Sequence, residues 1–446
     1  MAKDINSGAL TIKQIESFEK DFQTRPENKI MMNAVTRGNI QEIAINRQVI
    51  NQMDLSFSNE VESGGPITDQ MQAGTCWLFA ELNWLRTLAI KKMKAEKFEF
   101  SQNYIIFWNK LEKSNYFLEN MIEYRDKPWD DRRVYHLINI PVPDGGEWHM
   151  AADIIDKYGI VPKSAMPDTF NREKSKFLNE MLFYKLREGA AKLRAMHEEG
   201  KPVSALRKEK MEIMKLIYRI LAIMLGEPPR KFDFGFRDKD KKYHRSPGIT
   251  PKQFFKKYVG INTADIYCLL SCPTPDTPYY KTFTAEFFAN TIGGREMIAL
   301  NVPNNILLGR AIQVLKSGEA CLFSADVLQH SHSKEGLLDT GIYDYDLIFN
   351  TPFKMDKITR IQTLQTRLTH CMVLVGVDLV NGKPVKWKVE NSWGESVGKK
   401  GIFIMSENWF DEHVYALIIH KKFLTKKMLQ LFKQPPISLP PWHPMI

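Results

Sequence analysis

The hydrophobic pattern of this 446-residue chain changes from helical to strand-like along its length, and that change limits the fold more than any other feature. Residues 171–225 are rich in Lys, Glu, Leu and Met, which favours long helices whose mixed charges face solvent. From Ile342 onward, short β-branched and aromatic runs predict four strands between 372 and 419. Helices followed by strands, rather than alternating with them, predict an α+β fold.

The composition excludes several classes of protein. A hydrophobic content of 43% and a charged content of 26% are near globular averages, which excludes a disordered chain. The first twenty residues lack the apolar core of a secretory signal, and the longest apolar run, near Leu216–Leu225, is too short to span a bilayer. Five cysteines without framework spacing indicate a reducing compartment. We therefore expect a cytoplasmic protein without membrane association.

The net charge of +10 is compatible with a nucleic-acid partner. However, the sequence contains neither a basic cluster interleaved with aromatic residues nor a nucleic-acid-binding motif. An ordinary solvated surface is the simpler interpretation. Nucleic-acid binding nevertheless remains an alternative function.

Cys76 has the sequence setting of a nucleophile. It follows the turn Ala73-Gly74-Thr75 and opens a helix predicted to extend to about residue 97. A thiol at a helix N-terminus has a lowered pKa, and the unpaired N–H groups there can bind an oxyanion. The other cysteines, Cys268, Cys272, Cys321 and Cys371, are interpreted as packing residues.

A predicted hairpin brings a histidine and an asparagine together. If Asn381-Gly382 form a two-residue turn, His370 lies opposite Trp393 and diagonal to Asn391. His370 and Asn391 then share a sheet face, so the Asn391 amide oxygen can set the tautomer of His370 while Trp393 shields the hydrogen bond. Alternation turns the neighbouring Cys371 to the opposite face.

The segments around these positions resemble the motifs of papain-like cysteine peptidases. Residues 70–77 (QMQAGTCW) resemble the active-site segment, 368–370 (LTH) the histidine strand, and 390–394 (ENSWG) the asparagine motif. The interval between Cys76 and His370 is roughly twice that of ordinary papain relatives. Large insertions there are typical of the branch that contains bleomycin hydrolase and bacterial aminopeptidase C. Segments 98–102, 144–148, 157–163 and 440–445 also match that branch.

The resemblance implies a thiol peptidase that acts on peptides and needs neither a cofactor nor a metal. Cys76 would be the nucleophile, His370 its proton partner, and Asn391 the residue that orients His370. Gln70 would share the oxyanion hole with the N–H of Cys76. The implied substrate-binding residues are Gly145, Gly146 and Ile446, and the implied supporting residues are Trp77 and Trp393.

The resemblance also implies one two-lobed papain-like unit with large helical insertions and an N-terminal extension. Its expected parts are a helical extension (1–60), a helical lobe carrying Cys76 (61–165), mainly helical insertions (166–341), a β-rich lobe carrying His370 and Asn391 (342–430) and a C-terminal tail toward the active-site cleft (431–446). The branch forms homohexamers, which the resemblance extends to this chain.

The tail bears on the specificity of the implied enzyme. In this branch the terminal carboxylate holds the free amino group of the substrate, which makes the enzyme an aminopeptidase with broad specificity. The present sequence stops at Ile446, about four residues earlier than close relatives. An endopeptidase with the same chemistry is therefore the alternative to an aminopeptidase.

Overall fold

A twelve-stranded sheet occupies the centre of the computed structural model, which describes residues 8–445. The order of its main path is β14-β5-β6-β4-β13-β7-β10-β11-β12-β9-β8, and β1 pairs with β10 outside this path. In chain order the strands are β1 (Asn59–Glu60), β4 (Ile266–Leu270), β5 (Thr282–Ala285), β6 (Ala299–Asn301), β7 (Cys321–Ala325), β8 (Ser331–His332), β9 (Leu337–Leu338), β10 (His370–Val380), β11 (Lys383–Glu390), β12 (Ile402–Ser406), β13 (Val414–His420) and β14 (Ile437–Leu439).

The hairpin of β10 and β11 forms as predicted. Asn381 and Gly382 both have positive φ, at 53° and 76°, which is the backbone of a two-residue turn that matches strand twist. Two irregularities in the ladder shift the register by one residue and then shift it back, so that Val373 pairs with Glu390. The register set by the turn is therefore restored near His370.

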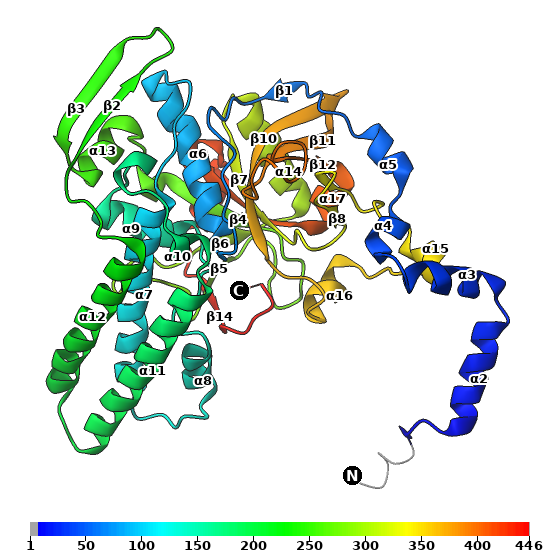
Figure 1. Cartoon of the computed structure of the whole chain (residues 1–446), viewed down its shortest axis with the longest axis horizontal. Coiled ribbons are helices and arrows are strands. Elements are labelled where there is room, and N and C mark those ends of the chain that lie inside the picture. Colours follow the sequence, from blue (N-terminus) through cyan, green and yellow to red (C-terminus); the bar gives the residue numbers. More distant parts are fainter. Residues whose placement is uncertain (1–7, 446) are drawn as a thin grey trace.

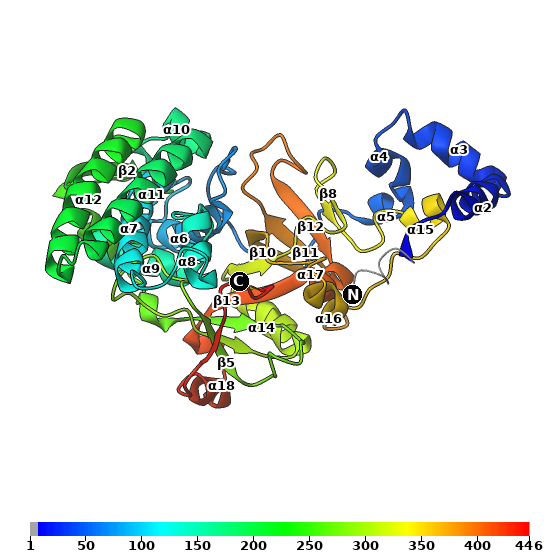
Figure 2. The same ribbon diagram turned by 90° about the horizontal axis from the view of Figure 1, so that it is seen from below.

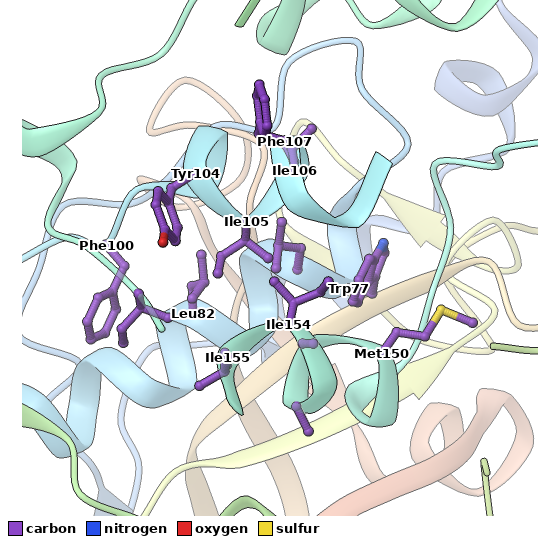
Figure 3. Packing of buried hydrophobic residues seen from close by; sticks show 14 of the residues in the cluster. Trp77, Leu82, Phe100, Tyr104, Ile105, Ile106, Phe107, Met150, Ile154 and Ile155 are labelled. Carbon is purple, nitrogen blue, oxygen red and sulfur yellow. The ribbon is translucent and has the colours of Figure 1, made fainter. Parts of the chain in front are cut away.

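The helical lobe packs on one face of the sheet around α6 (Cys76–Met93). This helix is buried on nearly all sides because it lies between β10 and the helices α7 and α9. Figure 3 shows Trp77 and Leu82 of α6 packed among aromatic and aliphatic side chains of the two neighbouring helices. The remaining helices of this lobe are α7 (Gln102–Glu123), α8 (Arg132–Asn139), α9 (Trp148–Tyr158), α10 (Phe170–Glu173), α11 (Lys176–Glu198), α12 (Val203–Leu225) and α13 (Pro251–Tyr258), and the hairpin β2 (Phe232–Arg237) and β3 (Tyr243–Ile249) adjoins them.

The opposite face of the sheet carries a second hydrophobic core. Met372 and Leu374 of β10 belong to this core together with residues of α14 and α17, whereas Val373 and Val375 belong to the core around α6. The helices that follow the helical lobe are α14 (Asn304–Lys316), α15 (Tyr345–Phe349), α16 (Lys357–Gln362), α17 (Glu407–His413) and α18 (Lys426–Leu431). The α+β fold with a helical and a β-rich lobe is confirmed.

The prediction that 166–341 is mainly helical is wrong for its second half. Residues 176–225 form the two long helices α11 and α12, but 226–341 contains eight strands, β2 to β9. Strands β4 and β7 lie next to β13 in the middle of the sheet. Several of these strands are short and fully buried, so their sequences lack the polar–apolar alternation that indicates a strand.

An arm of four helices projects from the β-rich lobe (Figures 1 and 2). These are α2 (Ile12–Gln23), α3 (Pro26–Val35), α4 (Ile40–Ala44) and α5 (Arg47–Gln52). Ala44 packs with Ile342 and Ile404 in a small cluster that anchors the base of the arm. Helix α2 has no buried residue. None of the helices in the described part of the chain is both long and apolar enough to cross a membrane.

Candidate active site

Cys76 is the first residue of α6, and the turn before it is fixed by Asp144. The carboxylate of Asp144 accepts hydrogen bonds from the N–H of Gly74 (3.3 Å) and from the Ser175 hydroxyl (2.7 Å). It also forms an ion pair with Lys110 of α7 (2.6 Å). Burial alone would raise the pKa of Asp144, but Lys110 and the hydrogen bonds hold it well below its usual value. Asp144 therefore connects the turn before Cys76 to α7 through Lys110 and to the start of α11 through Ser175.

His370 and Asn391 meet as the hairpin register predicts. The Nε2 atom of His370 lies 2.7 Å from the Oδ1 atom of Asn391, and both residues are buried. The ring centroid of Trp393 lies 4.8 Å from that of His370, so the indole covers the hydrogen bond. Because Nε2 is used by Asn391, the other ring nitrogen of His370 is the one directed to Cys76.

Cys76 and His370 line one cavity of about 1040 Å³. The pKa of the Cys76 thiol is well below its ordinary value because the Cys371 thiol donates a hydrogen bond to it, with further contributions from the charge and a hydrogen bond of His370. Burial opposes this shift. The site therefore favours a thiolate at Cys76.

Cys371 packs against the core around α6, as interpreted, but it also has a place in the site. Strand alternation places the Cys371 side chain on the sheet face opposite to that of His370. Cys371 nevertheless lines the same cavity as Cys76. Its thiol also lies 3.1 Å from the Ser324 hydroxyl. The face of β10 that carries Cys371 is the one on which α6 packs, so the start of α6 brings Cys76 to it.

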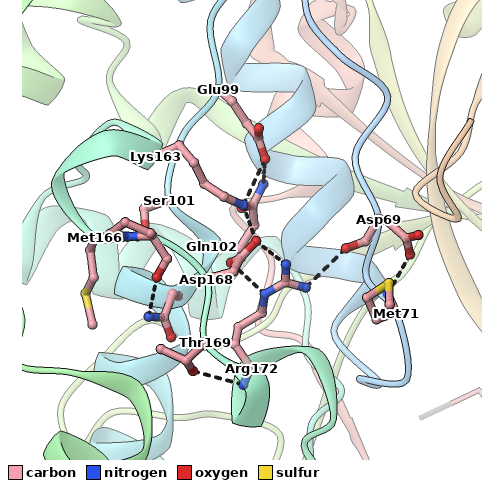
Figure 4. A network of polar contacts seen from close by, with 12 residues as sticks. Asp69, Met71, Glu99, Ser101, Gln102, Lys163, Met166, Asp168, Thr169 and Arg172 are labelled. Carbon is pink, nitrogen blue, oxygen red and sulfur yellow. Dashed lines mark hydrogen bonds and ion pairs between the residues drawn. The ribbon is translucent and has the colours of Figure 1, made fainter.

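Gln70 connects the turn before Cys76 to the asparagine motif. Its Nε2 donates to the Ala73 carbonyl (3.0 Å), and its Oε1 accepts from the Ser392 hydroxyl (2.8 Å). The adjacent Asp69 carbonyl accepts a hydrogen bond from Arg172, within the polar network of Figure 4. Gln70 is not among the residues that line the cavity of Cys76 and His370.

The two glycines predicted to bind substrate differ in their surroundings. A Cβ on Gly146 would lie 2.7 Å from the ring of Trp77, so close packing requires glycine there. A Cβ on Gly145 would meet no atom within 4 Å. The Trp77 indole N–H also donates to the Asp144 carbonyl (2.8 Å), which holds this loop against the start of α6.

The C-terminal tail reaches the same cavity. Leu439 and Met445 are among its lining residues. Ile446, the predicted substrate-binding residue of the tail, lies outside the described residues.

Sequence reasoning overlooked several residues of the site. Asp144 and Glu147 belong to the DGGEW segment, in which only the glycines were predicted to have a role. Arg86 and Glu390 form a fully buried ion pair (2.5 Å) that links α6 to the residue before Asn391. In the sequence, Glu390 could have been found because it immediately precedes Asn391. No sequence pattern around Arg86 identifies that residue as the ion-pair partner of Glu390.

The arrangement contains no metal-binding cluster in residues 8–445, since no three His, Cys, Asp or Glu side chains there lie close enough to hold an ion. The chemistry available is that of a thiolate beside an imidazole whose far nitrogen is hydrogen-bonded to an amide.

Comparison with known proteins identifies relatives over the whole chain. The sequence profile of the Peptidase C1-like family matches residues 9–446. Aminopeptidase C of Lactobacillus delbrueckii subsp. lactis is 41% identical over 98% of each chain, and bleomycin hydrolase of Gallus gallus is 37% identical over 99% of each. The crystal structure of PepW from Lactobacillus rhamnosis superposes with a TM-score of 0.96 at 44% identity, covering 98% of this chain and 99% of that one. The chain therefore belongs to the Peptidase C1-like family and is a cysteine-type peptidase.

Proposed function

We propose that this chain is a cysteine aminopeptidase that removes N-terminal residues from peptides with broad specificity. The observation that carries the proposal is that one cavity holds Cys76 at the start of α6 and the imidazole of His370 bonded to Asn391. Similarity over the full length to proteins named aminopeptidase C supports the exopeptidase part.

In the proposed reaction, the Cys76 thiolate attacks the carbonyl carbon of the first peptide bond. Protonated His370 gives its Nδ1 proton to the leaving amine, and the C–N bond breaks to leave a thioester on Cys76. Neutral His370 then removes a proton from water, whose oxygen attacks the thioester carbon. The C–S bond breaks, which releases the acid product and restores the Cys76 thiolate beside protonated His370. The Asn391 amide oxygen accepts a hydrogen bond from the Nε2–H of His370 throughout, which keeps Nδ1 directed to the reaction.

The oxyanion of each tetrahedral intermediate would be bound by the N–H of Cys76 and the side chain of Gln70. The first N–H groups of a helix have no partner within it. The Gln70 amide uses one of its two hydrogens on the Ala73 carbonyl, so the second remains for the oxyanion. The Ser392 contact fixes the orientation of this amide.

Substrate would run in an extended form along Gly145 and Gly146. Gly145 has open space where a Cβ would stand, which lets a peptide backbone approach closely, while Gly146 packs on Trp77. Trp77 supports this loop and Trp393 shields His370. Ile446 would act at the end of the tail, whose described part reaches the cavity through Met445.

Product analysis on one peptide with a free and with an acetylated N-terminus tests the proposal. We expect stepwise release of single residues from the free peptide, because the site would recognise the terminal amine. The acetylated twin should be cleaved at least about tenfold more slowly, because it cannot form the charge-assisted hydrogen bond of the free amine. Mass spectrometry of timed samples reads both products directly.

The endopeptidase alternative predicts a different pattern. It requires internal fragments from both peptides and equal rates for the free and acetylated forms. Equal rates would exclude the aminopeptidase function but retain the cysteine-peptidase chemistry.

The proposed assembly is a homohexamer in the cytoplasm. Helix α2 carries Ile12, Ile15, Phe18 and Phe22 at helical spacing on one face, and these side chains are 38% to 72% exposed. Such a contiguous apolar face on a projecting arm supports contact with another copy of the chain. Five free cysteines, one of them a reactive thiol, support a reducing compartment.

Replacing Phe18 by glutamate should reduce the solution mass below that of six copies, because a charge would have to be buried at the contact. Ser17→Glu adds the same charge to the opposite face of α2 and should leave the mass unchanged. Light scattering coupled to gel filtration measures both variants. If Phe18→Glu has the same mass as the unaltered protein, the arm does not form the contact.

A further inference from the structure

Two cysteine thiols meet in the cavity of the candidate active site. Cys76 and Cys371 both line that cavity, and both are half-buried. The thiol and the backbone N–H of Cys371 each donate a hydrogen bond to the Cys76 sulfur. Side chains in hydrogen-bond contact need only a small rotation to bring their sulfurs within bonding distance. The proposed peptidase reaction uses Cys76 and gives Cys371 no reacting role.

The fold holds the two thiols together from separate elements. Cys76 begins α6, and Cys371 is the second residue of β10, the strand against which α6 packs. The Ser324 hydroxyl of β7 lies 3.1 Å from the Cys371 sulfur. Because a thiol has a single hydrogen, Ser324 is the donor in this contact while Cys371 donates to Cys76. Ser324 therefore orients the Cys371 thiol toward Cys76.

The third cysteine of the cavity lies away from Cys371. Cys268 also lines the cavity, but it belongs to β4, and the strands β13 and β7 separate β4 from β10. At about 4.8 Å per strand, Cys268 is about 14 Å from the strand that carries Cys371. Cys272 and Cys321 are buried. Among the five cysteines, all of which lie in residues 8–445, Cys371 is thus the one in contact with Cys76.

Cys76 is the cysteine that an oxidant should attack first, because peroxides react with thiolates rather than with thiols. The hydrogen bond from the Cys371 thiol, followed by the charge of His370, holds the pKa of Cys76 well below its ordinary value against the effect of burial. Burial raises the pKa of the Cys268 and Cys321 thiols, so these stay protonated. The cavity of about 1040 Å³ has ample room for hydrogen peroxide.

We propose that Cys76 and Cys371 form a peroxide-sensitive pair in which a disulfide reversibly blocks the nucleophile. The inference rests on the role of Cys76 in the proposed function and adds a modification site to it. The disulfide would also keep Cys76 from becoming a sulfinic acid, which thiol reductants do not reverse. Transient disulfides of this kind occur in reducing compartments, where thiol exchange reopens them.

The first step consumes one molecule of hydrogen peroxide. The Cys76 thiolate attacks one peroxide oxygen, so that an S–O bond forms and the O–O bond breaks. Protonated His370 gives its proton to the departing hydroxide, which leaves as water. The sulfur is oxidised by two electrons, the peroxide is reduced by two, and Cys76 becomes a sulfenic acid.

The second step joins the two sulfurs. While Cys76 is a thiolate, its hydrogen bond raises the pKa of the Cys371 thiol well above the ordinary value, and burial and the charge of Glu147 add to the shift. Oxidation removes that thiolate and frees Cys371 to react. The Cys371 sulfur attacks the Cys76 sulfur, an S–S bond forms, and the S–O bond breaks. The hydroxide leaves with the proton of Cys371 as a second molecule of water.

A peptide map of the full-length protein after a pulse of hydrogen peroxide tests the pair. The pulse should inactivate the unaltered protein, and the non-reduced map should contain a disulfide between Cys76 and Cys371, with a mass loss of about 2 Da. Dithiothreitol should then restore at least about 80% of the starting activity. A map in which Cys76 is a sulfinic acid, or is joined to Cys268 or to another chain, overturns the inference.

Cys371→Ser keeps a hydrogen-bond donor beside Cys76 but cannot form the disulfide. After dithiothreitol this variant should recover at least about fivefold less activity than the unaltered protein, because its Cys76 proceeds to the sulfinic acid. Cys268→Ala is the matched control, since it removes another thiol from the same cavity and should recover as the unaltered protein does. Equal recovery by Cys371→Ser would refute the protective disulfide.

Each variant is scored against its own activity before the pulse, because Cys371 also contributes to the pKa of Cys76. If Cys371→Ser has little activity at the outset, the peptide map alone reports the oxidation state of its Cys76. Loss of activity without a disulfide overturns the inference and leaves the proposed function standing. If the disulfide forms and hydrolysis continues at the original rate, Cys76 is not the nucleophile, and both the inference and the proposed reaction fail.

Discussion

Replacing Cys76 by alanine should reduce peptide hydrolysis by about 10,000-fold or more, the loss expected when the nucleophile of a covalent mechanism is removed. The thiol sits at the first position of α6, beside the imidazole of His370 and with a pKa well below its ordinary value. Alanine keeps the helix start and removes only the sulfur. Initial rates with a fluorogenic amino-acid amide measure the loss.

The matched control for this change is Cys321→Ala. Cys321 is buried in β7, and burial raises the pKa of its thiol, so it is neither accessible nor ionised. Its variant should hydrolyse the substrate at nearly the original rate. Iodoacetamide should also label Cys76 ahead of the other four cysteines, as peptide mapping would reveal. Hydrolysis by Cys76→Ala within tenfold of the unaltered protein would exclude the thiolate mechanism.

Replacing Arg86 by methionine should lower the free energy of unfolding by about 3–5 kcal/mol, the usual cost of leaving one partner of a buried ion pair uncompensated. Arg86 and Glu390 lie 2.5 Å apart, and each side chain is only 1% exposed. The guanidinium also donates to the Ser63 and Pro66 carbonyls, so its removal leaves further polar atoms unpaired. Urea unfolding followed by tryptophan fluorescence measures the change.

The same substitution should slow hydrolysis, because Glu390 immediately precedes Asn391 and the pair links α6 to this end of β11. The double variant Arg86→Met with Glu390→Gln should recover part of the lost stability, since it removes the unpaired charge. Arg133→Met removes a solvent-exposed pair with Glu286 and should hardly move the unfolding midpoint. Equal effects of the Arg86 and Arg133 changes would mean that the buried pair has no special role.

The residues placed correctly from sequence are those with strong local signals. The turn at Asn381-Gly382 sets the hairpin register, and from it the contact of His370 with Asn391 follows. The N-terminal position of Cys76 follows from helical spacing after a glycine-containing turn. Both signals act over a few residues, so no knowledge of distant contacts is needed.

Apart from the strand at Cys321, which the sequence indicated, the strands of 226–341 were missed for a physical reason. β6 is buried at all three positions, so it has no polar face to reveal it. Long buried helices such as α6 are also rich in apolar residues, so only the length of the apolar run distinguishes a buried helix from a buried strand. The sheet order, which inserts β13 between β4 and β7, depends on pairings between residues far apart in the chain.

The sequence by itself indicated the class of enzyme, a cysteine-type peptidase, and it predicted roles for Cys76, His370 and Asn391 from the local pattern around each. Only the tertiary structure decided what surrounds the thiol. The packing of α6 on one face of β10 brought Cys371 to Cys76, and the packing of Gly146 on Trp77 turned Glu147 to the same cavity. Such neighbours are set by how separate elements dock, and docking depends on the shape and burial of whole faces rather than on residues adjacent in sequence.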